Sequence, residues 1–142
     1  MLRKSLILLP LVVLFLWAGQ ASAQLSDRHA TLYFFWGDGC PHCVAEEVLL
    51  GRLKTQHPTL IIRDFEVWKN KDNQALLAKV TRGLKIKNSG VPLTIIGQES
   101  MVGYLNDQET GVLIENGVRA CLREDCPDLV APFLNDNPPP AE

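Results

Sequence analysis

The chain has 142 residues, of which 46% are hydrophobic, 21% charged and 7% aromatic, with 14 Lys+Arg against 16 Asp+Glu. This length suits one domain of ordinary size, and the composition excludes a largely disordered or collagen-like chain. A formal net charge of -2 supplies no basic field for nucleic acid, so we expect no nucleic-acid partner.

The N-terminus has the pattern of an export signal. Arg3 and Lys4 precede an apolar run over residues 6–17, which is too short to cross a bilayer comfortably. The small residues that end at Ala23 then match the site that a signal peptidase cleaves. We therefore expect residues 1–23 to be a removed signal peptide rather than a retained membrane anchor. The protein is then periplasmic or otherwise exported, with no stable membrane insertion.

The sequence after the signal first predicts a buried strand and a helix. Residues 30–36 form a continuous apolar run that ends at a glycine-rich turn, as expected of a central strand. From Cys40 onward, apolar residues recur at spacings of three and four, which predicts a helix that ends before Pro58. Its predicted apolar face consists of Val44, Ala45, Val48, Leu49 and Leu53. Its predicted opposite face carries Glu46, Glu47 and Arg52.

The middle of the chain predicts a strand, a helix and a hairpin. Residues 60–68 are β-branched and aromatic with partial alternation, which favours a second strand. Asp72 is the predicted cap of a second helix, which ends near Leu84. Residues 91–96 predict a third strand with a proline at its entry, and residues 100–104 predict its hairpin partner.

The C-terminal part predicts one more helix and a loose tail. Asn106 or Asp107 caps a helix that runs to about Leu122, whereas residues 135–142 have no means of packing. We therefore expect one domain over residues 24–134, of the α/β class and in the order β-α-β-α-β-β-α. The first two strands should be parallel and the final hairpin antiparallel, in a central mixed sheet of about four strands flanked by helices.

The chemistry is expected at Cys40-Pro41-His42-Cys43, where the first strand ends and the first helix begins. One helical turn brings two such cysteines within reach of a disulfide, and the amides and dipole of a helix start stabilise a thiolate at Cys40. Cys40 is therefore the predicted exposed and attacking member, and Cys43 resolves the mixed disulfide. His42 adds a positive or hydrogen-bonding contribution, and Pro41 suits the first helical turn.

Two other interpretations of this motif stay open. Cys40 and Cys43 form half of a zinc site if Cys121 and Cys126 supply the other half, or they form a purely structural disulfide. The second spacing is long for zinc, and an exposed helix start suits thiol exchange better than a structural bridge. We therefore expect redox chemistry with no metal and no bound organic cofactor.

A second cysteine pair follows the last predicted helix. Cys121 and Cys126 enclose four residues, and in an exported protein such a pair is expected to form a local structural disulfide that holds the C-terminus. The alternative is a second redox pair that passes electrons to Cys40 and Cys43. That alternative requires the sulfurs of the two pairs to meet.

These motifs resemble those of the thioredoxin-fold thiol–disulfide oxidoreductases. The resemblance rests on Phe35-Trp36, on the Cys-Pro-His-Cys motif and on Val91-Pro92, and it covers about residues 30–122. It implies that Pro92 is cis and lies against the active-site disulfide, and that the Val91 backbone pairs with an extended substrate peptide. Trp36 is expected to line one side of the site and, with Val91 and Pro92, to contact the substrate.

The Pro-His dipeptide is similar to that of periplasmic disulfide-forming oxidases, but the chain departs from the pattern. It lacks their helical insertion, and Phe34 stands six residues before the first cysteine, where the family often has a buried carboxylate. A proton acceptor for Cys43 must then come from elsewhere, with water or Glu47 as candidates. Asp64 and Glu66 are expected to be solvated strand residues, with an approach of either to Cys43 from the neighbouring strand as the alternative.

The second half of the domain also resembles glutaredoxins. The matching stretches are residues 91–97, residues 102–104 and Asn106-Asp107. In glutaredoxins the corresponding glycine-rich turn and helix start bind glutathione, but Tyr104 replaces a second glycine here. We therefore expect Gly103 to serve as a turn residue and Asp107 as a helix cap.

Taken together, the residues and the resemblance predict an exported enzyme that exchanges disulfides with protein substrates through Cys40 and Cys43. Its expected partners are protein dithiols or disulfides and a membrane redox partner that recharges the pair. The sequence leaves open whether substrates are oxidised or reduced. The alternative is a non-catalytic thioredoxin-like binding or chaperone module that uses a groove beside Pro92. Cys40→Ser separates the two, because an enzyme then loses exchange whereas a binding module keeps partner affinity.

Overall fold

The computed structural model describes residues 28–88 and 90–134. Its elements are β1 (Ala30–Trp36), α2 (Pro41–Gln56), β2 (Leu60–Glu66), α3 (Lys71–Gly83), β3 (Leu93–Ile96), β4 (Glu99–Val102), η1 (Asp107–Gly111), α4 (Val112–Arg123) and α5 (Ala131–Leu134). The predicted signal peptide, residues 1–23, and the predicted tail, residues 135–142, lie outside the described residues. Within the described ranges, no helix is long and apolar enough to cross a membrane.

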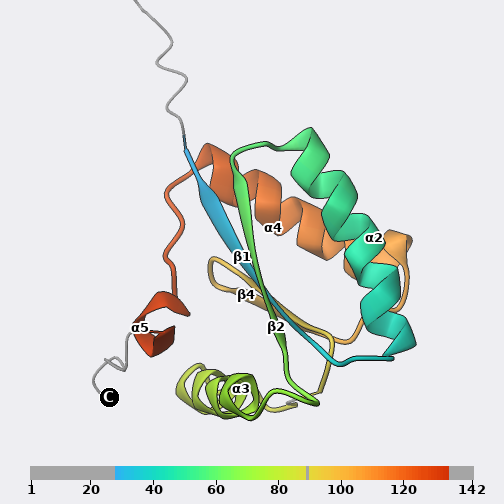
Figure 1. Cartoon of the computed structure of the whole chain (residues 1–142). Coiled ribbons are helices and arrows are strands. Elements are labelled where there is room, and N and C mark those ends of the chain that lie inside the picture. The colour runs from blue at the N-terminus through green and yellow to red at the C-terminus, as the bar shows by residue number, and fades with distance from the viewer. Residues whose placement is uncertain (1–27, 89, 135–142) are drawn as a thin grey trace, which may run out of the picture.

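The four strands form one mixed sheet in the order β2-β1-β3-β4. β1 pairs in parallel with β2 and antiparallel with β3, and β4 completes the antiparallel hairpin with β3. Helices α2 and α4 cover one face of the sheet, and α3 and α5 cover the other (Figure 1). This strand order, with helices on both faces, is a thioredoxin-like α/β fold, which confirms the predicted fold class.

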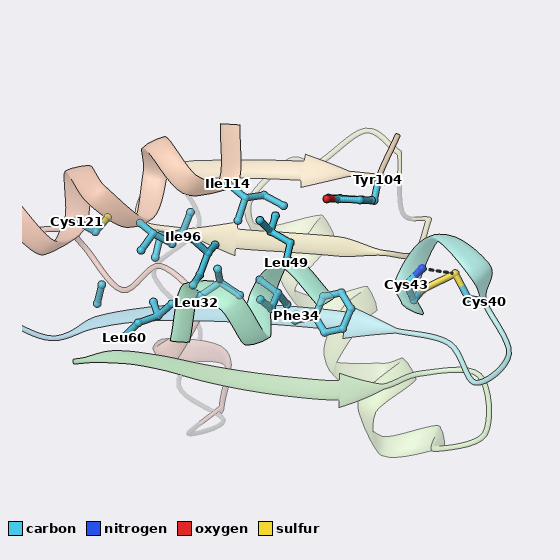
Figure 2. Close-up of a cluster of buried hydrophobic side chains, with 14 residues drawn as sticks. Leu32, Phe34, Cys40, Cys43, Leu49, Leu60, Ile96, Tyr104, Ile114 and Cys121 are labelled. Carbon is cyan, nitrogen blue, oxygen red and sulfur yellow. Dashed lines mark hydrogen bonds between the residues drawn. A yellow bond between two sulfur atoms is a disulfide. The ribbon is translucent and has the colours of Figure 1, made fainter. Parts of the chain in front are cut away.

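Alternation along the central strands builds a core on each face of the sheet. Successive side chains of a strand point to opposite faces, so a central strand buries both sets. In β1, Leu32 and Phe34 pack in the core beneath α2 and α4, and Tyr33 and Phe35 pack in the core beneath α3 and α5. Figure 2 shows the first of these, which we call the α2–α4 core.

The sheet-facing row of α2 differs from the prediction. Val44 and Val48 were expected to be buried, but they are 57% and 59% exposed. Leu49 and Leu53 are buried as predicted, and Cys43, Glu46 and Leu50 are buried beside them, whereas Ala45 is exposed. The placement of Glu46 on the outer face was therefore wrong. The row that begins at Cys43 faces the sheet, and it carries this carboxyl group into the α2–α4 core.

Several element boundaries also differ. β2 ends at Glu66, and Trp68 lies beyond it with 57% of its surface exposed. The predicted cap Asp72 was wrong, because Asn70 caps α3 and accepts the backbone N–H of Asp72 at 3.0 Å and that of Asn73 at 3.1 Å. Two residues of the capping type stand close together here, and the loop that leaves β2 determines which one begins the helix.

The last part of the chain adds a helix that the sequence pattern did not predict. Asn106, one of the two predicted caps, accepts the backbone N–H of Glu109 at 2.8 Å and starts η1, which leads into α4. The short helix α5 then returns to the opposite face of the sheet (Figure 1). Phe133 of α5 packs on Gly83 of α3, where a Cβ atom would lie 2.3 Å from the ring.

Candidate active site

The Cys-Pro-His-Cys motif lies at the junction of β1 and α2. Cys40 is the N-cap of α2, with extended backbone, and Pro41 is the first helical residue. Cys40 and Cys43 form a disulfide with a Cα–Cα distance of 5.3 Å, and the backbone N–H of Cys43 donates to the Cys40 sulfur at 3.2 Å (Figure 2). When the disulfide is reduced, this amide and the helix dipole stabilise a thiolate at Cys40.

Both sulfur-bearing residues are more enclosed than expected. Cys40 is 4% exposed and Cys43 is 1% exposed, so the prediction that Cys40 is an exposed member was wrong. Both cysteines belong to the α2–α4 core, and the partly buried side chains of Trp36 and Val91 pack against that core. An attacking thiolate therefore has a restricted approach to Cys40.

His42 is held by the loop that follows β4. Its Nδ1 atom lies 2.9 Å from the carbonyl oxygen of Tyr104. A carbonyl oxygen only accepts, so Nδ1 carries the hydrogen and donates it. The Nε2 atom is then the ring nitrogen that remains to contact a substrate.

The expected substrate-binding residues lie at the same end of the sheet as the disulfide. In the antiparallel pairing of β1 and β3, Phe35 lies opposite Leu93, so Pro92 lies beside the end of β1. The Val91–Pro92 peptide bond is cis. Trp36, on the other side, is half-buried and donates its indole N–H to Asp64 at 3.1 Å.

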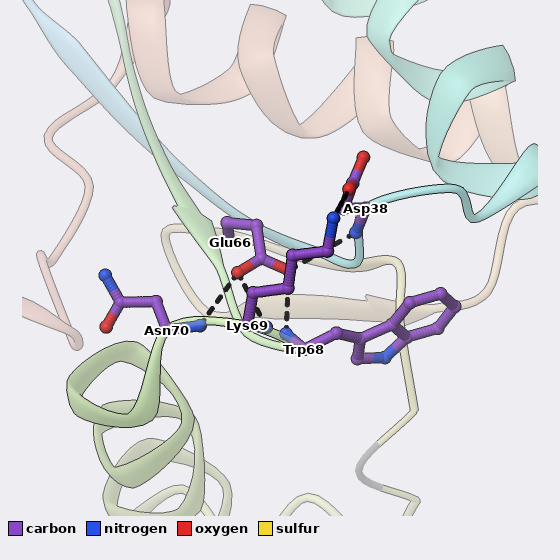
Figure 3. Close-up of polar contacts among 5 residues, drawn as sticks. All are labelled: Asp38, Glu66, Trp68, Lys69 and Asn70. Atoms are coloured by element: carbon purple, nitrogen blue, oxygen red, sulfur yellow. Dashed lines mark hydrogen bonds and ion pairs between the residues drawn. The ribbon is translucent and has the colours of Figure 1, made fainter.

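Glu66 joins the turn before Cys40 to the loop after β2. Its carboxylate accepts four backbone N–H groups, those of Asp38, Trp68, Lys69 and Asn70, at 2.8 to 3.3 Å (Figure 3). Desolvation acts in the opposite direction, but these donors hold the pKa of Glu66 below its ordinary value. Glu66 and Asp64, the two carboxylates considered for an approach to Cys43, are thus bonded to other groups.

Glu46 is the acidic residue that the sequence analysis missed. It is 1% exposed, and it lies one helical turn after Cys43 on the buried row of α2. Burial raises the pKa of Glu46 from 4.5 to about 7, although a hydrogen bond from the Thr94 hydroxyl favours the charged form. Glu47, the candidate named from the sequence, is exposed. The spacing of Cys43, Glu46, Leu50 and Leu53 was the signal that pointed to this row.

A polar chain ties the loop after β4 to α2. The Tyr104 hydroxyl donates to the Asp107 carboxylate, which also pairs with Arg52 of α2. Burial, and then the Asp107 carboxylate, raise the pKa of the Tyr104 phenol. The bonds from Tyr104 and Arg52 lower the pKa of Asp107. Asn106 serves as the cap that was also considered for Asp107, and Gly103 has the positive φ of a turn residue.

The second cysteine pair lies at the other end of β3. Cys121 and Cys126 form a disulfide with a Cα–Cα distance of 5.0 Å, and both sulfurs border Gly97. Gly97 and Pro92 flank β3, so they lie about 16 Å apart along an extended strand. Figure 2 likewise shows Cys121 and the Cys40–Cys43 disulfide at opposite ends of the α2–α4 core. The fold therefore keeps the two pairs of sulfurs too far apart for a shared zinc site or for direct exchange between the pairs. Within the described ranges, no three His, Cys, Asp or Glu side chains gather as a metal site.

Removal of the second pair is expected to affect stability and leave exchange unchanged. A disulfide that closes a loop of this length adds about 2 kcal/mol to the free energy of unfolding, because it lowers the conformational entropy of the unfolded chain. The variant with Cys121→Ser and Cys126→Ser should lose about that free energy of unfolding in urea. Its rate of thiol exchange should match the wild type. A reduced rate at unchanged stability would contradict the structural role.

The comparisons with known proteins concern the fold. No protein-family model matches the chain, and no curated protein matches it. A buckwheat glutaredoxin solved with glutathione is 19% identical, with 65% of this chain and 79% of that chain covered and a TM-score of 0.47. Mitochondrial thioredoxin 3 from Saccharomyces cerevisiae, in its oxidized form, is 13% identical, with 67% and 81% covered and a TM-score of 0.46. An uncharacterized thioredoxin-like protein from Clostridium perfringens is 20% identical, with 63% and 71% covered and a TM-score of 0.47.

The assignment of the fold rests on the strand order, the strand directions and the placement of the helices. The chain has a thioredoxin-like fold with a Cys-x-x-Cys pair at the start of a helix. That pair is consistent with thiol–disulfide exchange.

Proposed function

We propose that the protein is an exported thiol–disulfide oxidoreductase that exchanges disulfides with protein substrates through Cys40 and Cys43. The observation that carries this proposal is the disulfide at the start of α2, where the Cys43 amide donates to the Cys40 sulfur. This arrangement favours Cys40 as the thiolate that attacks and Cys43 as the thiol that resolves.

The exchange proceeds in two balanced steps. The Cys40 thiolate attacks one sulfur of a substrate disulfide, forms a mixed disulfide and releases the other substrate sulfur as a thiolate. The Cys43 thiolate then attacks the Cys40 sulfur, which forms the Cys40–Cys43 disulfide and releases the second substrate thiolate. The substrate is reduced by two electrons and the pair is oxidised by two. The reverse sequence oxidises a substrate dithiol.

The substrate is expected to bind at the end of the sheet where the pair lies. Trp36, Val91 and Pro92 are the residues proposed to contact it, because the β1–β3 pairing places them beside the Cys40 turn. An extended peptide bound to the Val91 backbone would present its sulfur along the restricted approach to Cys40. His42, held through Nδ1, offers its Nε2 atom from the exposed side of the helix start.

Export and recharging complete the proposal. The signal pattern at residues 1–23 supports export, and two disulfides in one small domain are typical of an oxidising compartment. A membrane redox partner would restore the pair after each turnover. The equilibrium reduction potential of the Cys40–Cys43 pair distinguishes an oxidase from a reductase.

Cys40→Ser is the variant that tests the function. The wild type should exchange with a disulfide-bonded peptide, and Cys40→Ser should fall to the uncatalysed background because no attacking sulfur remains. Cys43→Ser should instead stop at the mixed disulfide, which mass spectrometry detects as a covalent adduct. The variant with Cys121→Ser and Cys126→Ser is the control that keeps full exchange. A wild type without turnover whose partner affinity survives Cys40→Ser would be a binding module, contrary to the proposal.

A further inference from the structure

Glu46 is a buried ionisable group beside the resolving cysteine. The buried polar side chains in the described ranges are Glu46, Thr81 and Thr94, and of these only Glu46 ionises. It is 1% exposed. A carboxylate buried to this extent loses its hydration, so its position requires an explanation from its neighbours.

The helix directs the Glu46 carboxyl group toward Cys43. Residues three apart on a helix have Cβ atoms about 5–6 Å apart, and long side chains lean toward the N-terminus over the preceding turn. Cys43 occupies that preceding turn on the same buried row. The Thr94 hydroxyl donates to the carboxyl group from β3, two residues beyond Pro92 in the sequence. The carboxyl group therefore lies between α2 and β3, on the side of the helix that carries Cys43.

No cation among the described residues forms an ion pair with Glu46. The Thr94 hydroxyl from β3 bonds to it, and the Tyr104 phenol from the loop after β4 lies near enough to interact with its charge. Cys43 precedes it by three residues on the same buried row of α2. β1 supplies the apolar Phe34, which pairs with Thr94 in register. The carboxyl group is therefore not the anchor of an ion pair among the described residues. The Tyr104 phenol is bonded to Asp107, which leaves the thiol of Cys43, one turn earlier on the same row, as the acidic group for Glu46 to serve.

We propose that Glu46 accepts the proton of the Cys43 thiol when the Cys40–Cys43 disulfide closes and returns it when the disulfide opens. This inference rests on the proposed function. On closing, the thiol proton passes to the Glu46 carboxylate, the Cys43 thiolate attacks the Cys40 sulfur, and the substrate thiolate leaves and takes a proton from water. On opening, a substrate thiolate attacks Cys40, and Cys43 leaves with the electron pair and takes the proton of the Glu46 carboxylic acid.

The environment of Glu46 suits a group that both takes and gives a proton. With its pKa at about 7, the carboxyl group is half ionised near neutral pH, where proton transfer in either direction is efficient. The Thr94 hydroxyl keeps the pKa from rising further, because it donates to the charged form. β1 presents the apolar Phe34 opposite Thr94, so the carboxyl group that bonds to Thr94 comes from the helix.

Glu46→Gln and Glu47→Gln form a matched pair of test variants, one buried and one exposed on adjacent residues. A chromogenic aromatic disulfide reacts with the reduced protein and releases one coloured thiol as Cys40 attacks and a second as Cys43 closes the pair. For Glu46→Gln we expect the second release to be about tenfold slower at neutral pH and to lose its pH inflection near the Glu46 pKa. Glu47→Gln should stay within about twofold of the wild type, because an exposed carboxylate is screened by solvent.

A second readout follows the thiol itself. In a Cys40→Ser background, Cys43 is a free thiol whose thiolate absorbs in the ultraviolet. Adding Glu46→Gln should move this titration to lower pH, because the negative charge that opposes the thiolate is gone. Thr94→Val, which retains the carboxyl group, should move the kinetic inflection to higher pH. A mere packing role for Glu46 would move neither titration.

The outcomes separate the two proposals. If the wild type gives no first release, the proposed function fails. If the wild type gives both releases, Cys43→Ser gives only the first and Cys40→Ser lacks the fast first release, the function stands. Glu46→Gln with the rate and pH profile of the wild type would then overturn the role of Glu46. An unmoved inflection in Thr94→Val would overturn it as well, even if Glu46→Gln did not fold.

Discussion

Glu46→Gln is expected to be more stable than the wild type by about 3 kcal/mol at about pH 8 and equally stable at about pH 4. Burial raises the pKa of Glu46 from 4.5 to about 7, so between these values the folded state binds more protons than the unfolded state. The stability of the wild type therefore falls as the pH rises through this window. The neutral amide of glutamine removes the penalty, which is about 1.4 kcal/mol for each pKa unit.

Denaturation in urea from about pH 4 to about pH 8 measures this difference. Glu47→Gln is the control and should follow the wild type at every pH, because its side chain is exposed. Parallel curves for Glu46→Gln and the wild type would contradict a buried carboxyl group with a raised pKa. A variant that gains stability and loses the fast closing step would show that the carboxyl group is maintained at the expense of stability.

Gly97→Ala is expected to destabilise the protein by about 3 kcal/mol. Gly97 has a φ of 57°, in the left-handed region where a Cβ atom costs about 1–2 kcal/mol. That Cβ atom would also lie 2.8 Å from the Cys121 sulfur and 2.9 Å from the Cys126 sulfur. The disulfide has little freedom to retreat, so the turn or the end of α4 must shift, at a further cost of about 1–3 kcal/mol.

Alanine variants of two other glycines separate the cost of the left-handed backbone from the cost of the contact with the disulfide. Gly103 has a φ of 82° and open space around it. Gly103→Ala should therefore lower the free energy of unfolding only by the cost of a Cβ atom in the left-handed region, about 1–2 kcal/mol. Gly51 lies within α2 and also has open space around it. Gly51→Ala should therefore raise the free energy of unfolding by up to about 1 kcal/mol. Equal losses for Gly97→Ala and Gly103→Ala, measured as free energies of unfolding, would contradict close packing of the disulfide on the turn.

The order of the elements was predictable because each carries its own local pattern. The apolar run at residues 30–36 could fit only a strand buried on both faces, and β1 has those bounds. The cis bond before Pro92 was expected only from the resemblance, on the strength of the nearby cysteine motif. The disulfides followed from spacing, because three and five residues of separation allow local closure.

The buried face of α2 was not predictable from its apolar residues. Val44 and Val48 form one row and Cys43, Leu50 and Leu53 form another, and the second row contains a glutamate that argues against burial. Only the position of the helix on the sheet decides between them. The burial of Cys40 was missed for the same reason, because the enclosing side chains come from β1 and from the segment before β3. Helix α5 was missed because its four residues are too short for a periodic pattern.

The order of the strands also bears on how the molecule behaves in crowded solution. In the part of the chain that the structure describes, β2 and β4 are the edges of the sheet, where unpaired backbone groups invite another chain to add a strand. β2 carries exposed charges at Arg63 and Asp64, and β4 is only four residues long and begins with an exposed glutamate, Glu99. Charged and short edges resist such pairing. In the proposed function, contact with a substrate polypeptide is therefore expected at the end of the sheet that bears Cys40, and not at its edges.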